Sequence, residues 1–174
     1  SSLITKIGKA FHEFERLGLV DKGQTKIFAA QATGCSPVTT AIKNGSENII
    51  PVKPNTIAKS IAIGNPADGY YGIKTANISG GYGEDVSDEE VVASMRLLAE
   101  TEGIFTETAG GVTVGVTQKL IQQGRIKPDE VTVICITGNG LKTQEALTDS
   151  FADPIVIEPK IDSFEEIFAN GLAV

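Results

Sequence analysis

The stretch VTVICITGNGLKTQEAL, residues 131–147, gives the clearest indication of the fold class. Its first seven residues are rich in β-branched side chains, which predicts a buried strand over 131–137. The run ends at Thr137 and breaks into a Gly-Asn-Gly turn at 138–140. Parallel α/β sheets hold ligands beyond the carboxyl ends of their strands. We therefore expect Thr137 to point at a ligand.

Outward from this strand, short apolar runs alternate with helical patterns of ~10–15 residues, which predicts an α/β fold with a parallel sheet and crossovers. Ser87 followed by Glu90 forms a capping box at the start of the clearest helix. Further strands are predicted at 25–32, 104–107 and 154–159. Helices are predicted at 3–17, from Pro37, at 56–63, 69–81, 87–103 and 108–124, and from a last cap at Ser163 with Glu166.

Length and composition narrow the possible classes of protein. At 174 residues, the chain is predicted to form a single domain over 1–174. A net charge of -7 without a basic stripe argues against a nucleic-acid partner. No stretch is apolar and long enough to span a membrane, and no signal-peptide pattern is present, so we expect no membrane partner and a cytoplasmic location.

Metal and histidine chemistry find little support in the sequence. The isolated Cys35 and Cys135 form no CxxC or Cys/His cluster, and we expect both to be reduced. A single histidine, His12, nearly removes histidine triads and multi-histidine metal sites from consideration. The acidic run at 84–90 is read either as a solvated helix start or as a metal site. No metal ligand is predicted.

Three loops that follow predicted strands carry small or hydroxyl residues: 33–36, 108–111 and 137–140. On parallel strands these loops would share one edge of the sheet, where glycines let a ligand approach backbone N–H groups. The alternative interpretation of each loop is an ordinary turn, in which these residues serve the backbone conformation and bind no ligand. Lys142 is read as a Schiff-base lysine or a solvated side chain, and Glu107 as a functional carboxylate or a helix N-terminal partner. The GNGLKT sequence lacks the second glycine of a phosphate-binding loop.

Three long stretches resemble the threonine synthase family: TIAKSIAIGNP at 56–66, VSDEEVVASMRLLAETEGIFTE at 86–107 and GRIKPDEVTVICITGNGLK at 124–142. The members of this family are pyridoxal-phosphate enzymes of the tryptophan-synthase-β type. The resemblance implies the C-terminal part of a fold-type II large domain. Such a domain is a three-layer parallel sheet with helices on both faces.

The resemblance also assigns roles to individual residues. Thr137 takes the place of the family threonine that contacts the pyridine nitrogen of the cofactor, and Gly138 follows it. Asn139 replaces the histidine of the family's T-G-H-G-L-K segment. Glu107 and Ala109 keep two positions of the family's E-P-A-S segment, whose proline and serine are lost here.

Two further segments would line the substrate side. The chain's ATGCSP resembles the family's A-E-G-A-A-P, which places Gly34 and Cys35 near the substrate, with Thr33 replacing the acid. Gly64 and Asn65 match a family G-N-P. The catalytic residues proper are absent, since no lysine here has the context of the family's Schiff-base lysine. The glycine-and-asparagine phosphate cup is expected to precede Ser1.

The resemblance therefore implies a full enzyme that converts O-phospho-L-homoserine and water to L-threonine and phosphate, using pyridoxal 5'-phosphate. This chain alone is expected to be inactive and to bind no cofactor covalently. Its partners would be a phosphorylated amino acid and either a second copy or the missing N-terminal half. Two alternatives remain open: a related enzyme acting on phosphoserine or serine, and a non-catalytic domain that binds a small anion or a partner protein.

Overall fold

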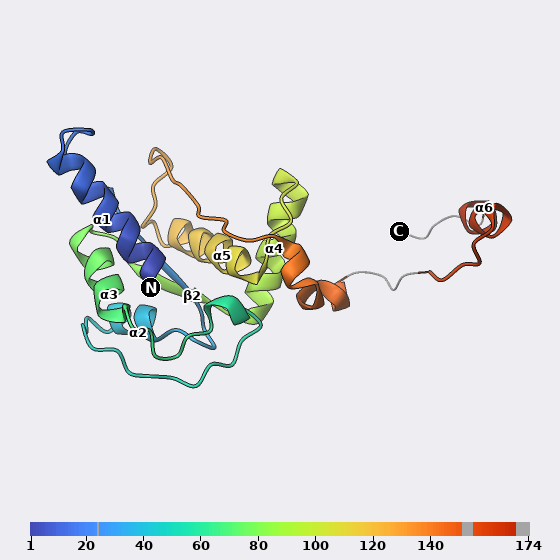
Figure 1. Ribbon diagram of the computed structural model, residues 1–174, viewed down its shortest axis with the longest axis horizontal. Helices are drawn as coiled ribbons and strands as arrows, with labels where there is room; N and C mark the ends of the chain where they lie inside the picture. The colour runs from blue at the N-terminus through green and yellow to red at the C-terminus, as the bar shows by residue number, and fades with distance from the viewer. Residues whose placement is uncertain (24, 151–154, 170–174) are drawn as a thin grey trace.

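Helices and strands alternate along most of the chain in a computed structural model, which describes residues 1–23, 25–150 and 155–169 (Figure 1). The α-helices are α1 (Ser2–Arg16), α2 (Pro37–Lys43), α3 (Gly69–Ile78), α4 (Asp88–Glu102), α5 (Thr108–Gln122) and α6 (Ile161–Ala169). The strands are β1 (Ala29–Ala32) and β2 (Gly83–Val86). Three 3₁₀ turns complete the order: η1 (Lys59–Ile61), η2 (Gly140–Lys142) and η3 (Gln144–Ser150).

Helix α4 forms where its end signals place it. The Ser87 hydroxyl accepts the N–H of Glu90, and the Glu90 carboxylate accepts the N–H of Ser87, so the predicted capping box is confirmed. The helix ends at Gly103, whose φ of 67° lies in the left-handed region that glycine adopts readily. Helix α2 begins at Pro37, also as predicted.

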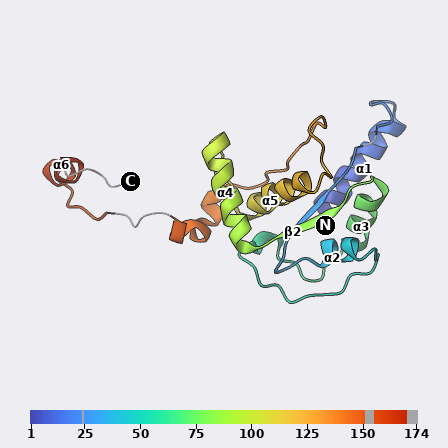
Figure 2. The ribbon, with the colours of Figure 1, turned by 180° about the vertical axis from the view of Figure 1, so that it is seen from behind.

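Strands β1 and β2 are parallel neighbours, in register from Ala29 opposite Gly83 to Ala32 opposite Val86. The crossover between them carries α2, η1 and α3. Helices α2 and α3 pack against the strands from one side, and α5 packs from the other with α4 beside it. Figures 1 and 2 show the strands between these two groups of helices.

Each face of the strand pair has its own apolar core. The core toward α4 and α5 includes Ala32, Val86, Val91, Met95, Val112, Val116 and Leu120. The core toward α2 and α3 consists of Ala29, Val38, Ala41, Ile42, Ile73 and Ala76. Side chains of a strand alternate between the two faces, which is why Ala29 and Ala32 belong to different cores. The arrangement is the predicted α/β class, with a small parallel sheet between helical layers.

Several predicted strands are wrong. Residues 131–137 form no strand, and Val131 and Val133 are exposed. Over 104–107 the structure has one antiparallel bridge, Thr106 with Asn139, instead of a strand. Residues 155–159 form no strand either, and residue 154 lies outside the described residues. A strand needs a hydrogen-bonded neighbour along its length, and within the described residues 131–137 and 155–159 have no such neighbour, whereas 104–107 has only this short bridge.

Other boundaries also differ from the predictions. The 56–63 helix is limited to the single turn η1, and α6 begins at Ile161, so Ser163 lies inside the helix and is not its cap. Strand β2 was not predicted, because its sequence Gly-Glu-Asp-Val carries two charges and looks like the approach to α4. Its acidic side chains are held in a polar network that gives them partners.

Candidate functional site

The loop before α5 and the Gly-Asn-Gly turn lie against each other. The N–H of Glu107 donates to the carbonyl of Gly138 at 3.2 Å, and the N–H of Gly140 donates to the carbonyl of Phe105 at 3.0 Å. The hydroxyl of Thr106, which is fully buried, donates to the Gly138 carbonyl at 3.2 Å. Two of the three predicted ligand loops are therefore joined, although 32 residues separate them in the sequence.

Glu107 fixes the start of α5. It is the N-cap residue, and its carbonyl accepts the N–H groups of Gly110 and Gly111 at 3.0 and 3.2 Å. Its side chain is buried against the turn, so that a Cβ added to Gly138 would come within 2.0 Å of the carboxylate oxygen Oε1. A side chain at position 138 would therefore displace the Glu107 carboxylate from its place against the turn.

Thr137 and Ala109 line the same groove, which has a volume of about 880 Å³. The groove runs between α1, β1, α5 and the segment 131–137, and its lining is mostly apolar. Among the described residues, the hydroxyl of Thr137 makes no hydrogen bond. It is thus a polar group available to a ligand at the wall of an apolar groove.

Thr108, the first residue of α5, belongs to the predicted loop 108–111, where no separate role was expected for it. It is fully buried, and its hydroxyl is the one buried side-chain polar atom without a hydrogen-bond partner in the described part of the chain. Its N–H donates to the hydroxyl of Thr143 at 3.2 Å. Burial of a hydroxyl without a hydrogen-bond partner is costly, so the Thr108 hydroxyl is a candidate contact for a ligand.

A second group of predicted residues is gathered by one extended segment. The N–H of Asn55 donates to the carbonyl of Gly34 at 2.9 Å, and the N–H of Val52 donates to the carbonyl of Gly64 at 3.0 Å. A Cβ at Gly34 or Gly64 would lie 1.8 Å from the carbonyl oxygen of Asn55 or Val52. Both glycines are therefore needed for backbone contact, and Asn65 beside Gly64 is exposed. No hydrogen bond joins this group to Glu107 or Gly138 within the described residues.

Cys35 lies in the β1–α2 loop with its thiol turned inward. Only 2% of the residue is exposed, and burial raises the pKa of the thiol. Its N–H donates to the carbonyl of Ala32 at 2.8 Å. A buried neutral thiol shapes the loop as a small apolar group.

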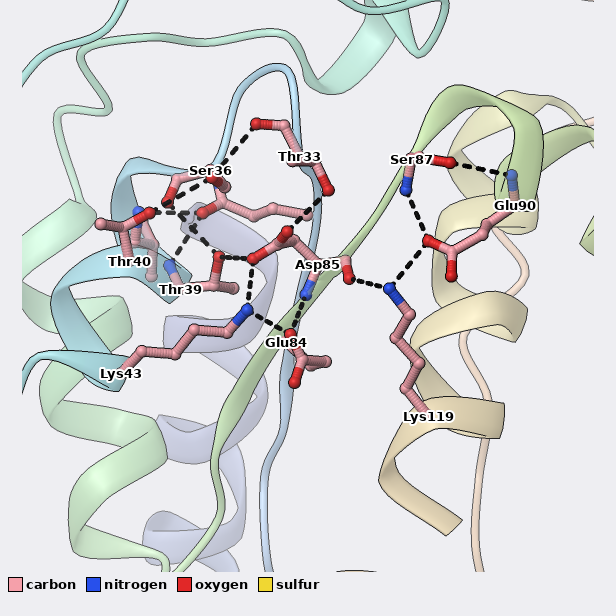
Figure 3. A network of polar contacts seen from close by, with 12 residues as sticks. Thr33, Ser36, Thr39, Thr40, Lys43, Glu84, Asp85, Ser87, Glu90 and Lys119 are labelled. Carbon is pink, nitrogen blue, oxygen red and sulfur yellow. Dashed lines mark hydrogen bonds and ion pairs between the residues drawn. The ribbon is translucent and has the colours of Figure 1, made fainter. Parts of the chain in front are cut away.

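A polar network fixes this loop to β2 (Figure 3). Thr33 donates its hydroxyl to Asp85 at 2.7 Å. Lys43 of α2 donates to Asp85 at 2.6 Å and forms an ion pair with Glu84. From α5, Lys119 donates to the backbone carbonyl of Asp85 at 3.0 Å. Side chains from both helical layers thus converge on β2.

The charges of this network stabilise one another. Burial opposes ionisation of Glu84, but hydrogen bonds from Gln123 and Lys43, and then from a backbone N–H, outweigh it and lower its pKa to about 2. For Lys43, burial acts in the opposite direction and would lower its pKa. The hydrogen bonds of Lys43 to Asp85 and Glu84 outweigh burial and raise the pKa. Both groups are therefore held in their charged forms at neutral pH.

Sequence reasoning treated the acidic run as a solvated helix start or a metal site. Glu84, with 8% exposure, is neither. Residues 88–90 do begin α4, where Asp88 also accepts from the Thr56 hydroxyl at 2.5 Å. Over residues 1–23, 25–150 and 155–169, no group of three or more His, Cys, Asp or Glu side chains is placed to hold a metal ion. In the same ranges no helix is long and apolar enough to cross a membrane.

Comparison with known proteins places this arrangement in a family. Residues 1–138 match the family described as "Pyridoxal-phosphate dependent enzyme". The chain belongs to this family. Two solved structures share its fold: a threonine deaminase from T.th., with a TM-score of 0.51, 16% identity and coverage of 72% of this chain and 42% of that one, and an L-serine ammonia-lyase of Rhizomucor miehei, with a TM-score of 0.54, 20% identity and coverage of 79% and 45%.

Within the family, the chain is similar to threonine synthases. It is 39% identical to that of Methanocaldococcus jannaschii over 165 residues, which are 94% of this chain and 40% of the relative. It is 40% identical to that of Methanosarcina acetivorans over the same shares of the two chains. With the threonine synthase of Halalkalibacterium halodurans it shares 32% identity over 97% of this chain and 46% of the relative. The chain thus spans less than half the length of these relatives.

Proposed function

We propose that these 174 residues are the C-terminal part of a threonine synthase, which converts O-phospho-L-homoserine and water to L-threonine and phosphate. The observation that carries the proposal is similarity to threonine synthases across 94% of the chain. The junction of Glu107 with Gly138 supports it, because two loops assigned to substrate and cofactor lie in direct contact.

Pyridoxal 5'-phosphate fits the described residues at its pyridine end. Thr137 offers a hydroxyl without a protein partner at the wall of the groove, and Gly138 adds no side chain beside it. These two residues would hold the ring nitrogen. When bound, the cofactor supplies an electron sink for carbanion chemistry. A hydroxyl partner, unlike a carboxylate, leaves the nitrogen unprotonated and so tunes the strength of that sink.

The substrate side would be formed by backbone groups more than by charged side chains. Gly34, Gly64 and Asn65 come from the two loops tied by residues 52–55, and Cys35 contributes through its buried packing. Glu107 and Ala109 lie at the N-terminus of α5, where the helix dipole favours an anionic substrate group. A phosphorylated amino acid carries two such groups.

The Schiff-base lysine and the phosphate cup would come from polypeptide outside residues 1–174, the N-terminal half that the resemblance implies. The chain alone is then catalytically inactive. Intact mass after borohydride reduction tests this point, and we expect 18.3 kDa with no adduct. A covalent adduct on the 174-residue chain would refute it and would make Lys142 the first lysine to examine.

The reaction is tested on the complete gene product that contains these residues, by phosphate release from O-phospho-L-homoserine beside phosphoserine and serine. We expect the homoserine ester to be preferred. A preference for phosphoserine or serine would favour the related enzymes, and no turnover of any of them would favour a non-catalytic binding domain.

Thr137→Val in the complete gene product tests the cofactor contact. Loss of one hydrogen bond of ~1.4 kcal/mol predicts about a tenfold lower rate and a shifted cofactor absorption band. Thr137→Ser, which keeps the hydroxyl, is the matched control. An unchanged spectrum and rate in Thr137→Val would refute the role.

A further inference from the structure

The loop 33–36, between β1 and α2, offers a ligand its backbone more than its side chains. The hydroxyls of Thr33 and Ser36 are already engaged in hydrogen bonds, and Cys35 is buried. The backbone N–H groups of Gly34 and Ser36, in contrast, donate to no other group within the described residues. Unpaired N–H donors in a loop suit an anionic group such as a carboxylate or a phosphate. The direction of these donors depends on the contacts that fix the loop.

Two backbone hydrogen bonds hold the loop from within. The N–H of Thr33 donates to the carbonyl of Val86, and the N–H of Cys35 donates to the carbonyl of Ala32, both at 2.8 Å. Gly34 lies between these donors and has no side chain to restrict the peptide groups on either side of it. Neutral hydrogen bonds of a surface loop open more readily than those of a core element. A side chain that ties the loop to a strand would therefore restrict its conformation further.

Asp85 of β2 makes this contact. Its carboxylate oxygen Oδ1 accepts a hydrogen bond from the hydroxyl of Thr33, at the start of the loop, at 2.7 Å. Its other oxygen, Oδ2, accepts from Lys43 at 2.6 Å and from the Thr39 hydroxyl at 3.4 Å, and both of these residues belong to α2, which follows the loop. Figure 3 shows Asp85 between Thr33 and Lys43. One carboxylate thus ties both ends of the loop to β2.

The hydrogen bond from Thr33 to Asp85 is of the strong, charge-assisted kind. The side chain of Asp85 is only 14% exposed, and a hydrogen bond to a carboxylate with little access to water is stronger than one between neutral groups. The Lys43 ammonium also pairs with Glu84, and one cation between two neighbouring carboxylates reduces their mutual repulsion. The contact with Thr33 is therefore built on a carboxylate that α2 already holds in place.

We propose that Asp85 is a positioning residue: through Thr33 it holds the loop so that the N–H groups of Gly34 and Ser36 meet an anionic group of the substrate. The inference rests on the proposed function, in which this loop lines the substrate side. Asp85 itself touches neither substrate nor cofactor and acts through Thr33. Its loss should therefore weaken substrate binding and leave the chemical step intact.

The first measurement is steady-state kinetics of the complete gene product that contains these residues. Thr33→Val removes the hydroxyl, Asp85→Ala removes its acceptor, and Thr33→Ser is the control that keeps the hydrogen bond. We expect Thr33→Val and Asp85→Ala each to raise KM for O-phospho-L-homoserine about tenfold, with kcat within about twofold of the wild type. Thr33→Ser should keep the wild-type KM. The double variant should be no worse than the more affected single variant, because both residues act through one contact.

The second measurement is amide hydrogen exchange of the same proteins without substrate, which reports the loop whatever the reaction is. The N–H groups of Thr33 and Cys35 are hydrogen-bonded, and we expect their protection to fall at least about tenfold in Thr33→Val and Asp85→Ala. Glu84→Gln is the matched control, because Glu84 shares Lys43 with Asp85 but makes no hydrogen bond to the loop in the described part of the chain. It should leave protection at both amides within about twofold of the wild type.

Three results would overturn the proposal. If Thr33→Val leaves the protection of the loop unchanged, the backbone hydrogen bonds alone hold it. If Glu84→Gln or Thr33→Ser loses as much protection as Thr33→Val, the network only stabilises the fold. If protection falls in Thr33→Val while KM stays the same, or kcat falls in place of a rise in KM, the loop does not bind the substrate in the way proposed.

Two further cases are distinguishable from these. If Asp85→Ala fails to fold, Thr33→Val decides, because it leaves the ion pairs of Lys43 in place. If the wild type turns over none of the substrates, the proposed function fails by itself. Hydrogen exchange then still decides whether Asp85 holds the loop, and equal protection in the wild type and Thr33→Val refutes that role.

Discussion

Strand β2 and the segment 131–137 have the opposite secondary structure to that which their sequences predict. The segment reads Val-Thr-Val-Ile-Cys-Ile-Thr, rich in strand-favouring residues, and forms no strand. Strand β2 reads Gly-Glu-Asp-Val and is the ordered neighbour of β1. The difference is in partners: β2 has a backbone ladder on one side and ion pairs from α2, whereas in the described part of the chain the segment 131–137 makes no hydrogen bond and is anchored only by its flanking residues, Glu130 and Asn139. Strand propensity is realised only where a neighbour supplies hydrogen bonds.

The first test of this comparison removes an ion pair of β2. Glu84→Ala leaves the Lys43 ammonium with Asp85 as its one remaining carboxylate partner in the described part of the chain and removes the acceptor of Gln123, and we expect a loss of about 2 kcal/mol in the free energy of unfolding. Chemical denaturation of both proteins measures it. Glu84→Gln, which keeps the shape and the acceptor oxygen, is the control and should lose less. Equal, small losses in both variants would mean that β2 owes its order to the backbone ladder alone.

Acid should weaken the same contact. The folded pKa of Glu84, about 2, lies below the ordinary 4.5, so its stabilisation is fully present above pH 4.5 and is lost as the pH falls toward 2. With a discount for the partly exposed Lys43, the amount is about 2 kcal/mol. The unfolding free energies of the wild type and Glu84→Gln, measured from pH 6 to 2.5, should converge. A difference that stays constant over this range would contradict the prediction.

A matched pair of valine truncations compares the two regions directly. Val86→Ala removes a fully buried side chain next to the α4–α5 core, at an expected cost of about 2 kcal/mol. Val133→Ala removes a mostly exposed one and should cost less than ~0.5 kcal/mol. Denaturation midpoints measure both. Equal costs would show that the segment is packed in solution.

The smallest effect concerns the residue after β2. Ser87→Ala removes the N-cap hydroxyl of α4, and we expect a loss of about 1 kcal/mol, seen as a lower melting temperature. Ser87→Thr keeps the acceptor and should restore most of it. If Ser87→Ala were neutral, the strand rather than the cap would fix where α4 begins.

Helices were predicted better than strands, for a physical reason. The period of α1 and the capping box of α4 are local signals, and both helices formed as expected. Strand pairing depends on residues far away in the sequence. The pairing of β1 with β2 brings together positions 54 residues apart, and the two acidic side chains of β2 gain their partners only through the fold.

In the candidate site, too, some residues were predicted from the sequence and some contacts were found only in the structure. Residue types and the family resemblance marked Glu107 and Gly138, and the structure shows why their loops are neighbours. The pairing of Thr108 with Thr143 spans 35 residues and leaves no mark in the sequence. The clamp of Thr33 by Asp85 spans 52. Neither contact follows from a regular spacing in the sequence, so both could be identified only in the folded structure.

Tyr82, just before β2, has an optical consequence. Its ring packs against both apolar cores, and the guanidinium of Arg125 lies 3.4 Å from the ring centroid. The protein has three tyrosines and no tryptophan. Tyr70 and Tyr71 lie exposed on α3, in contact with each other. Near-ultraviolet circular dichroism of the chain should therefore be dominated by the Tyr82 phenol, which packs against both cores, and this makes Tyr82 a spectroscopic reporter of whether the two helical layers are joined.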